Sequence, residues 1–324
     1  MADLRVQDSF EMNVIIPSFL KSGDTIGIVA TARWITTEQL KSATDLFESW
    51  GFKCRVASNI HSQLFQLAGS KEERLSATQQ LLDDPEIKAI IVARGGYGTV
   101  HLIDDLDFSQ FMKYPKWICG YSDITVLHAH LNSKGIATIH STMPVSFKDA
   151  TAVALENIRM ALTGELQEIS FSLEQNSGLS RLPVHSLPIM GGNLSVLYSM
   201  LGSSSLQPIE PFILFIEDVD EMYYHIDRMM YGLMRAGFLK EVKAVLLGGL
   251  TQMKDNTADF GFQVNNPWGT GALTTICEFF EERKISVLSG FPAGHQNDNR
   301  AFYLGVNCDL ERKDGRAVVR FQHV

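Results

Sequence analysis

Long apolar runs are missing from the sequence, and cysteine is scarce. No stretch approaches the roughly 18 consecutive apolar residues that a membrane-spanning helix requires, so no association with a membrane is expected. The first residues, Met1 to Phe10, are interrupted by charges and lack the apolar segment of a secretory signal. The four cysteines, Cys54, Cys119, Cys277 and Cys308, stand far apart and form no Cys-x-x-Cys pair. This pattern predicts reduced, mostly buried thiols in a cytoplasmic protein.

Basic residues are outnumbered by acidic ones. The 324 residues include 28 Lys and Arg against 37 Asp and Glu, which gives a formal net charge of −9. A protein that binds a nucleic-acid backbone needs a basic face, so a nucleic-acid partner is not expected. With 45% hydrophobic residues, a chain of this length can bury the cores of about two domains.

Complete nucleotide-binding and metal-binding motifs are also absent. The run Gly95-Gly96-Tyr97-Gly98 is glycine-rich, but His101 stands where a dinucleotide fingerprint needs its last glycine, and no Lys-Ser or Lys-Thr follows as in a P-loop. No His-Glu-x-x-His occurs, and His128 and His130 would point to different faces of a helix. We therefore predict no metal and no other cofactor. Nucleotide binding is the weakest of three interpretations of the glycine run. The other two are a tight turn that needs positive φ, and a loop whose backbone amides approach a reacting oxygen, as in an oxyanion hole.

The first half of the chain alternates buried strands with amphipathic helices. Short apolar runs typical of buried strands lie at residues 24–30, 52–56, 89–93, 117–119 and 136–140. Helical patterns lie at 36–50, 70–82, 100–106, 123–132 and 150–162, and the first two begin with capping boxes, Thr36 to Gln39 and Ser70 to Glu73. This alternation predicts a doubly wound, mostly parallel sheet, whose ligand site lies at the carboxyl ends of its strands.

The second half predicts a smaller mixed α/β domain. Residues 164–187 are polar and irregular, so we divide the chain into an N-terminal domain at 1–165, a linker at 166–187 and a C-terminal domain at 188–324. Strands are expected at 212–216, 242–247, 286–288, 301–306 and 317–321, the last two closing the fold around an Asp314-Gly315 turn. Helices are expected up to residue 201, at 223–236 and within 271–282.

Three chemically suited side chains stand at predicted strand ends. Ser122 lies in the turn after the strand at 117–119, in half of a nucleophile elbow, with Ile124 in place of the second glycine. Glu217 directly follows an apolar strand, and His295 lies in a loop after the strand at 286–288. These are the residue types of serine–base–orienter catalysis. Structural alternatives remain open, because Ser122 and Glu217 could each cap a following helix.

Seven short motifs then appear in one order along nearly the whole chain from about residue 20. They are Gly23-Asp24-Thr25-Ile26, Ala68-Gly69-Ser70 with Arg74, Ala93-Arg94-Gly95-Gly96-Tyr97-Gly98, Gly120-Tyr121-Ser122-Asp123-Ile124-Thr125, Gly191-Gly192-Asn193-Leu194, Phe215-Ile216-Glu217-Asp218 and Pro292-Ala293-Gly294-His295. The ordered set resembles the serine LD-carboxypeptidase family, which includes the microcin C7 self-immunity proteins.

The resemblance implies a fold and a mechanism. It implies a Rossmann-like N-terminal domain, a smaller C-terminal domain and an active site between them, in a homodimer. The catalytic triad would be Ser122, Glu217 and His295, and the oxyanion hole would be the backbone amides of Gly96 and Asp123. The substrate would be a small peptide, with the bond to the terminal D-alanine of a cytosolic murein tetrapeptide cleaved during cell-wall recycling.

Other features bear on substrate choice. Arg94 and Tyr97 are candidate substrate contacts, Arg94 for a terminal carboxylate. The chain has Ala30-Thr31-Ala32 where the family often has Pro-Ser, and His140-Ser141-Thr142-Met143-Pro144 where it often has His-Gly-Pro. Both segments border the expected cleft. Two alternatives are a hydrolase of peptidyl or aminoacyl adenylates, as in the microcin-immunity branch, and a non-catalytic binding protein on the same scaffold.

Overall fold

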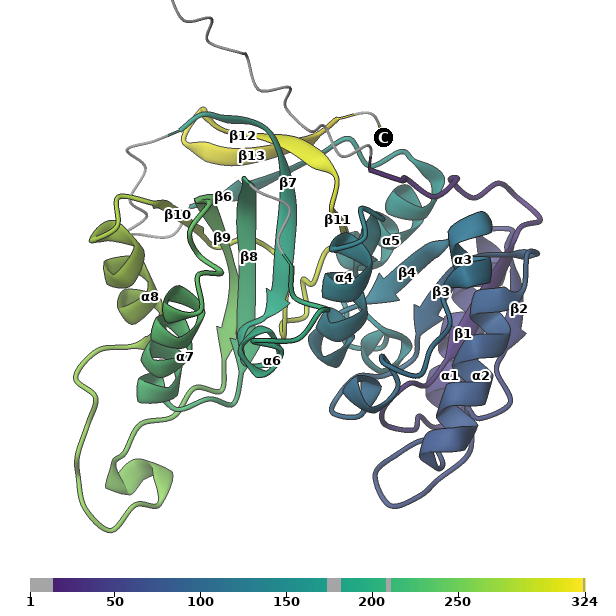
Figure 1. Ribbon diagram of the computed structural model, residues 1–324, viewed down its shortest axis with the longest axis horizontal. Coiled ribbons are helices and arrows are strands. Elements are labelled where there is room, and N and C mark those ends of the chain that lie inside the picture. The colour runs from purple at the N-terminus through teal and green to yellow at the C-terminus, as the bar shows by residue number, and fades with distance from the viewer. Residues whose placement is uncertain (1–13, 174–181, 208–210, 323) are drawn as a thin grey trace, which may run out of the picture.

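The computed structural model describes residues 14–173, 182–207, 211–322 and 324, and it contains two sheets that lie side by side (Figure 1). The predicted absence of a signal segment at Met1 to Phe10 therefore lies outside the described residues, as does the middle of the predicted linker, 174–181. Helices α4 and α6 lie between the two sheets (Figure 1). No helix in the described part of the chain is both long enough and apolar enough to cross a membrane.

The N-terminal sheet has six strands, in the order β11-β5-β4-β3-β1-β2. Five of them, β1 to β5, are parallel, and β11 runs antiparallel to β5 at one edge. The strands are β1 (Thr25–Val29), β2 (Lys53–Val56), β3 (Ile87–Val92), β4 (Trp117–Gly120), β5 (Thr138–His140) and β11 (Phe302–Leu304). The prediction of a doubly wound, mostly parallel sheet is confirmed.

Helices connect these strands, and both predicted capping boxes form. The helices are α1 (Thr37–Ser49), α2 (Lys71–Asp83), α3 (Ser109–Lys113), α4 (Thr125–Asn132) and α5 (Ala152–Thr163), with 3-10 turns η1 (Thr99–His101), η2 (Ser122–Ile124) and η3 (Pro144–Ser146). The helix predicted at 100–106 is wrong. Leu102, Ile103 and Leu106 are buried as the pattern suggested, but Val100 is exposed. The amide of Thr99 is bonded to the Asp123 carboxylate, and the chain forms only a single 3-10 turn.

The C-terminal sheet has seven strands, in the order β10-β9-β8-β7-β12-β13-β6. Strands β7 to β10 are parallel, and β12, β13 and β6 pair antiparallel. The strands are β6 (Glu168–Ser172), β7 (Val184–Asn193), β8 (Phe212–Val219), β9 (Val242–Thr251), β10 (Ser286–Ser289), β12 (Asn307–Lys313) and β13 (Arg316–Phe321). Helices α6 (Leu194–Ser199), α7 (Tyr223–Arg235) and α8 (Ala272–Glu281) and the 3-10 turn η4 (Ala258–Phe260) complete this half.

Two sequence expectations need correction here. The range predicted as an irregular linker contains β6 and the start of β7, because both are recruited to the C-terminal sheet. The segment predicted as the first closing strand is β11, which joins the other sheet, and the hairpin around Asp314-Gly315 is formed by β12 and β13. All three residues of β11 are buried, whereas burial alternates along β12, as expected for a strand with one covered face.

The two halves pack directly on one another. The amide of Asn193, at the end of β7, donates to Thr125 Oγ1 on α4 over 3.0 Å. A Cβ atom at Gly192, whose φ is +150°, would lie 2.4 Å from the same oxygen. Both buried clusters of the core contain side chains from both sheets. The carboxyl ends of β3, β4 and β8 are thereby brought to one region.

Candidate active site

Ser122 occupies a strained elbow between β4 and α4. Its φ is +63°, a left-handed conformation that non-glycine residues seldom adopt. Such strain is characteristic of a serine exposed on a strand-to-helix turn. Ser122 Oγ forms no hydrogen bond with any residue that the structure describes, and η2 has no side-chain cap. The structure therefore gives no support to the alternative of Ser122 as a helix cap.

A buried histidine holds the strand that delivers this serine. His128 Nε2 lies 2.9 Å from the carbonyl oxygen of Gly120, and its Nδ1 lies 2.9 Å from Thr138 Oγ1. A carbonyl only accepts, so Nε2 carries the proton and Nδ1 accepts from the threonine. Burial lowers the pKa of His128 to about 4, which keeps the ring neutral at physiological pH. His130 bonds instead to Ser205, so the two histidines do face different surroundings.

The glycine turn after β3 lies against the elbow. A Cβ atom at Gly95 would lie 3.4 Å from Ser122 Cβ, so a larger residue there would crowd the serine. Gly96, with φ +107°, shares a cavity of about 340 Å³ with Ser122 and Asp123. The Asp123 carboxylate accepts from the amide of Thr99 over 2.9 Å and joins the two loops. The glycine turn thus has positive φ at Gly96 and Gly98, and its backbone at Gly95 lies beside Ser122.

Glu217 and His295 form a short hydrogen bond. His295 Nδ1 lies 2.6 Å from Glu217 Oε2, and the His295 amide donates to the same oxygen over 3.3 Å. The Glu217 side chain is fully buried at the end of β8. Gly294 has φ +102°, and a Cβ atom there would lie 2.7 Å from Glu217 Cβ, so only glycine permits this approach. Glu217 does not cap the next helix, because the cap position of α7 is Met222.

The environment of His295 makes it a stronger base. Burial alone would lower its pKa, but the charge of Glu217, their hydrogen bond and the charge of Asp218 outweigh burial, and the pKa is raised above 6.5. Because Nδ1 donates to the carboxylate, Nε2 is the nitrogen left to accept a proton.

The loop that carries His295 is attached to both halves of the molecule. Asn299 Oδ1 accepts from His140 Nε2 of the N-terminal sheet and from the amide of Gly294, each over 2.8 Å. Thr251 Oγ1 of β9 donates to the carbonyl oxygen of His295. The position of the imidazole therefore depends on contacts from both sheets.

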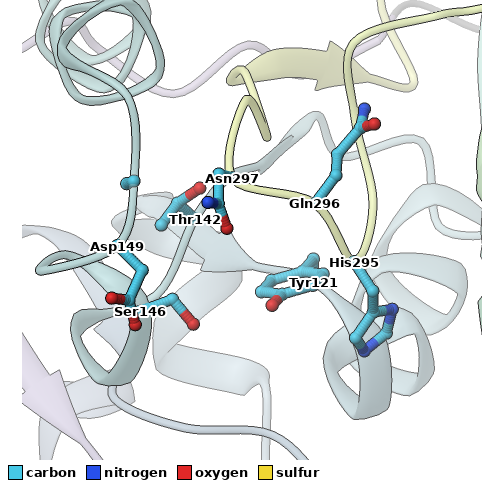
Figure 2. Close-up of a pocket in the computed structure, with 8 residues that line it drawn as sticks. Tyr121, Thr142, Ser146, Asp149, His295, Gln296 and Asn297 are labelled. Carbon is cyan, nitrogen blue, oxygen red and sulfur yellow. The ribbon is translucent and has the colours of Figure 1, made fainter. Parts of the chain in front are cut away.

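Tyr121 connects this loop to the elbow. Its ring centroid lies 4.9 Å from that of His295, and Figure 2 shows the two side by side at the edge of a second cavity, of about 210 Å³. Ser122 lines the larger cavity and His295 the smaller one. No hydrogen bond joins Ser122 to His295 within the described residues, as is common in enzymes without substrate.

The two predicted substrate contacts differ in their placement. Tyr97 is 54% exposed and lines the cavity that contains Ser122. Arg94 lines neither of these cavities and donates from Nη1 to the carbonyl oxygen of Trp34 over 3.1 Å.

Sequence reasoning gave no role to Asp218, Tyr121 or Asn299. Asp218 lines the larger cavity, and burial together with the charge of Glu217 raises its pKa to about 7. The signal available for Asp218 and Tyr121 was their adjacency to Glu217 and Ser122. The role of Asn299 had no local signal, because its partner His140 is 159 residues away.

Within the described ranges, no group of three or more His, Cys, Asp or Glu side chains could hold a metal ion.

Both halves of the chain are similar to known proteins. Residues 26–141 match the LD-carboxypeptidase N-terminal domain, and residues 188–310 match the LD-carboxypeptidase C-terminal domain. The chain is 30% identical over 315 residues to the "Probable murein peptide carboxypeptidase" of Bacillus subtilis (strain 168), which covers 94% of this chain and 93% of the relative.

Solved structures give the same result. The muramoyltetrapeptide carboxypeptidase from Oxalobacter formigenes superimposes with a TM-score of 0.79 at 27% identity, over 92% of this chain and 98% of that one. The microcin C7 self-immunity protein MccF, solved in complex with aspartyl sulfamoyl adenosine, shares the fold with a TM-score of 0.79 at 22% identity, over 96% and 99% of the two chains. The chain therefore belongs to the LD-carboxypeptidase family and is a serine-type carboxypeptidase.

Proposed function

We propose that this carboxypeptidase hydrolyses the bond before the terminal D-alanine of a murein tetrapeptide, with Ser122 as nucleophile, His295 as general base and Glu217 as its orienting carboxylate. The observation that carries the proposal is the 2.6 Å bond between His295 and the buried Glu217. The ring of His295 also packs against Tyr121, the residue that precedes the strained Ser122. The relative from Oxalobacter formigenes, named a muramoyltetrapeptide carboxypeptidase, supports the choice of substrate.

In this mechanism His295 Nε2 accepts the Ser122 proton as Oγ attacks the peptide carbonyl. Glu217 holds the imidazole in the required tautomer and stabilises the imidazolium. His295 then gives the proton to the leaving amine of D-alanine, which breaks the C–N bond and leaves an acyl-enzyme. A water molecule, deprotonated by the same histidine, hydrolyses the ester and restores Ser122.

The backbone amides of Gly96 and Asp123 would stabilise the tetrahedral oxyanion. Both residues line the cavity that holds Ser122, and the close contact of Gly95 with Ser122 brings the glycine turn to the reacting centre. Loss of one such donor typically costs about 3 kcal/mol of transition-state stabilisation. A role in cytosolic cell-wall recycling and a homodimeric assembly remain predictions from the family resemblance.

Ser122→Ala is the direct test. We expect purified wild-type protein to release D-alanine from the murein tetrapeptide, and Ser122→Ala to lose at least about 1,000-fold in kcat, as triad variants do. Ser76→Ala, an exposed serine on α2, is the matched control and should keep the wild-type rate. Release of D-alanine by Ser122→Ala at the wild-type rate would show that the triad assignment is wrong and leave a binding role.

Hydrolysis of an aminoacyl adenylate is the second candidate, and the shared fold of MccF suggests it. A comparison of kcat/KM for the murein tetrapeptide and for aspartyl sulfamoyl adenosine distinguishes the two candidate functions. A preference for the adenosine compound would overturn our first choice.

A further inference from the structure

Two arginines flank the glycine turn. Arg33 follows β1 and Arg94 follows β3, and these strands are neighbours in the sheet. The amide of Arg33 donates to the carbonyl oxygen of Gly95 over 3.4 Å. The Arg33 side chain covers Gly96, since a Cβ atom there would lie 2.6 Å from both Cδ and Nε of the arginine. Arg33 was not singled out from the sequence.

The charge of this pair is uncompensated. Arg33 Nε is buried and has no hydrogen-bond partner among the described residues. Arg94 donates only from Nη1, to the carbonyl oxygen of Trp34, and neither arginine has an ion pair in the described part of the chain. Burial and the nearby charge of Arg33 both lower the pKa of Arg94. Buried donors normally have acceptors, and two cations close to one another are normally paired with an anionic group. Acidic side chains outnumber basic ones in this protein, whose net charge is −9, yet none pairs with these two arginines among the described residues.

Arg74 shows how an internal arginine is satisfied in the same fold. Its Nε also lacks a partner, but Nη1 donates to the carbonyl oxygens of Thr31 and Gly98 over 2.7 and 2.9 Å. The charge of Asp123 also favours its protonated form. The Arg33 guanidinium has no carbonyl acceptor and no carboxylate partner among the described residues. Unlike the fully buried Arg74, it is partly exposed. An anion arriving from solvent could therefore reach Arg33.

We propose that Arg33 and Arg94 together bind the terminal carboxylate of the peptide substrate. The inference rests on the proposed function, in which the Gly96 amide stabilises the oxyanion. Arg33 covers Gly96, and the neighbouring Gly95 lies beside Ser122, since a Cβ atom on it would lie 3.4 Å from Ser122 Cβ. In a carboxypeptidase substrate the terminal carboxylate is only one residue from the scissile carbonyl, so the anion site must adjoin the oxyanion hole. Guanidinium groups suit this ligand because they bind carboxylates through two parallel hydrogen bonds.

The test uses a matched pair of substrates. One is the tetrapeptide with a free terminal D-alanine, and the other is the same peptide ending in D-alaninamide. We expect wild-type protein to favour the free acid in kcat/KM, and Arg33→Met to reduce this preference by about 10- to 100-fold, the range for loss of hydrogen bonds to a charged group. Arg33→Lys should keep part of the preference. The inference is overturned if Arg33→Met keeps the wild-type preference ratio or loses activity on both substrates equally.

Two controls complete the design. Arg55→Met removes an exposed arginine that is paired with Asp84 and Glu86, and it should keep the wild-type preference ratio. Arg94→Met should reduce the ratio as Arg33→Met does, although it also removes the bond to Trp34. The ratio is measured on one preparation of each variant, so partial misfolding lowers both rates and leaves the ratio unchanged.

Binding separates failure of this inference from failure of the proposed function. N-acetyl-D-alanine and N-acetyl-D-alaninamide are titrated calorimetrically into wild-type and Arg33→Met proteins. Tighter binding of the acid, lost in Arg33→Met, supports the anion site even if wild-type protein releases no D-alanine from the tetrapeptide. Equal binding of acid and amide to the wild type, or unchanged binding of the acid to Arg33→Met, overturns the anion site even if the tetrapeptide is hydrolysed.

Discussion

At the residue scale, Ser122 combines an unfavourable backbone conformation with a hydroxyl that has no hydrogen-bond partner among the described residues. A left-handed φ costs a non-glycine residue about 1 to 2 kcal/mol. The surrounding contacts hold the residue in this conformation, chiefly the bond from His128 to Gly120 and the burial of η2. Such a cost at a cleft is typical of a functional position.

This strain leads to a stability prediction. Ser122→Gly should be more stable than Ser122→Ala by about 1 kcal/mol, because glycine adopts φ +63° without the steric cost of a Cβ atom. Both variants lack the hydroxyl and should be inactive. Urea unfolding followed by circular dichroism measures the difference, and an alanine variant as stable as the glycine variant would mean that the elbow is not strained.

The charge around His295 leads to a pH prediction. The base works only when neutral, and its pKa is raised, so kcat/KM should fall as the pH decreases through a midpoint above 6.5. Asp218→Asn removes one of the charges that raise this pKa and should shift the midpoint downward. Asp45→Asn, on exposed α1, is the control and should leave it in place. A midpoint that stays fixed or moves upward in Asp218→Asn would contradict the electrostatic account.

At the element scale, the end of β7 joins the two halves. Asn193 caps α6 through Oδ1, its Nδ2 donates to Asp218, and its amide donates to Thr125 at the start of α4. The helix after Ser122 is thus fixed to the strand beside Glu217. This contact requires that Gly192 have no side chain.

Gly192→Ala should therefore destabilise the protein by about 1 to 3 kcal/mol and lower kcat, because the added methyl group would press on Thr125 and shift α4. Gly202→Ala is a matched control with φ +86° and no atom within 4 Å of the new Cβ, so it carries backbone strain without a clash. Equal loss of activity in the two variants would argue against a role for the β7–α4 contact. Thermal unfolding and steady-state rates provide both measurements.

At the scale of the whole molecule, the chain crosses between the halves more than once. It leaves the N-terminal sheet for β6, returns as β11, and ends in the β12–β13 hairpin of the other sheet. Because of this path, His140 of β5 can hold Asn299 in the loop of His295. The candidate site is therefore part of the interface, and its geometry depends on both sheets.

Buried histidines should make the whole fold sensitive to acid. Burial lowers the pKa of His128 to about 4 and that of His140 to about 3, whereas in the unfolded chain both take up protons near pH 6.5. The unfolded state binds more protons below pH 6.5, so the free energy of unfolding should fall as the pH is lowered from 6.5 to about 4. The loss for His128 should be on the order of 3 kcal/mol over this window.

Urea unfolding at several pH values between 4 and 7 measures this dependence. His128→Gln, whose amide can still donate to the carbonyl oxygen of Gly120, should show a shallower slope than the wild type. An identical slope in the two proteins would show that His128 does not contribute to acid sensitivity.

Local patterns in the sequence predicted much of the fold. The capping boxes at Thr36 and Ser70 and the apolar runs of β1, β3, β4 and β8 depend on residues a few positions apart, and the prediction of their structure is confirmed. The errors involve distant partners. Residues 302–304 read as a strand, but nothing local indicates that they pair with β5. Leu102, Ile103 and Leu106 are buried in an irregular turn, where Thr99 is bonded to the distant Asp123.

Residue type and position after an apolar run were enough to predict Ser122, Glu217 and His295 as candidate site residues. The tertiary structure adds that Glu217 and His295 form a hydrogen bond, that Ser122 has a left-handed backbone, and that Arg94 is close enough to Arg33 for its charge to lower the Arg94 pKa. The physical reason is the range of the interactions. Hydrogen bonds within a helix turn and the periodicity of burial are recorded in neighbouring residues, whereas contacts across 78 residues, such as Glu217 to His295, form only when two sheets pack.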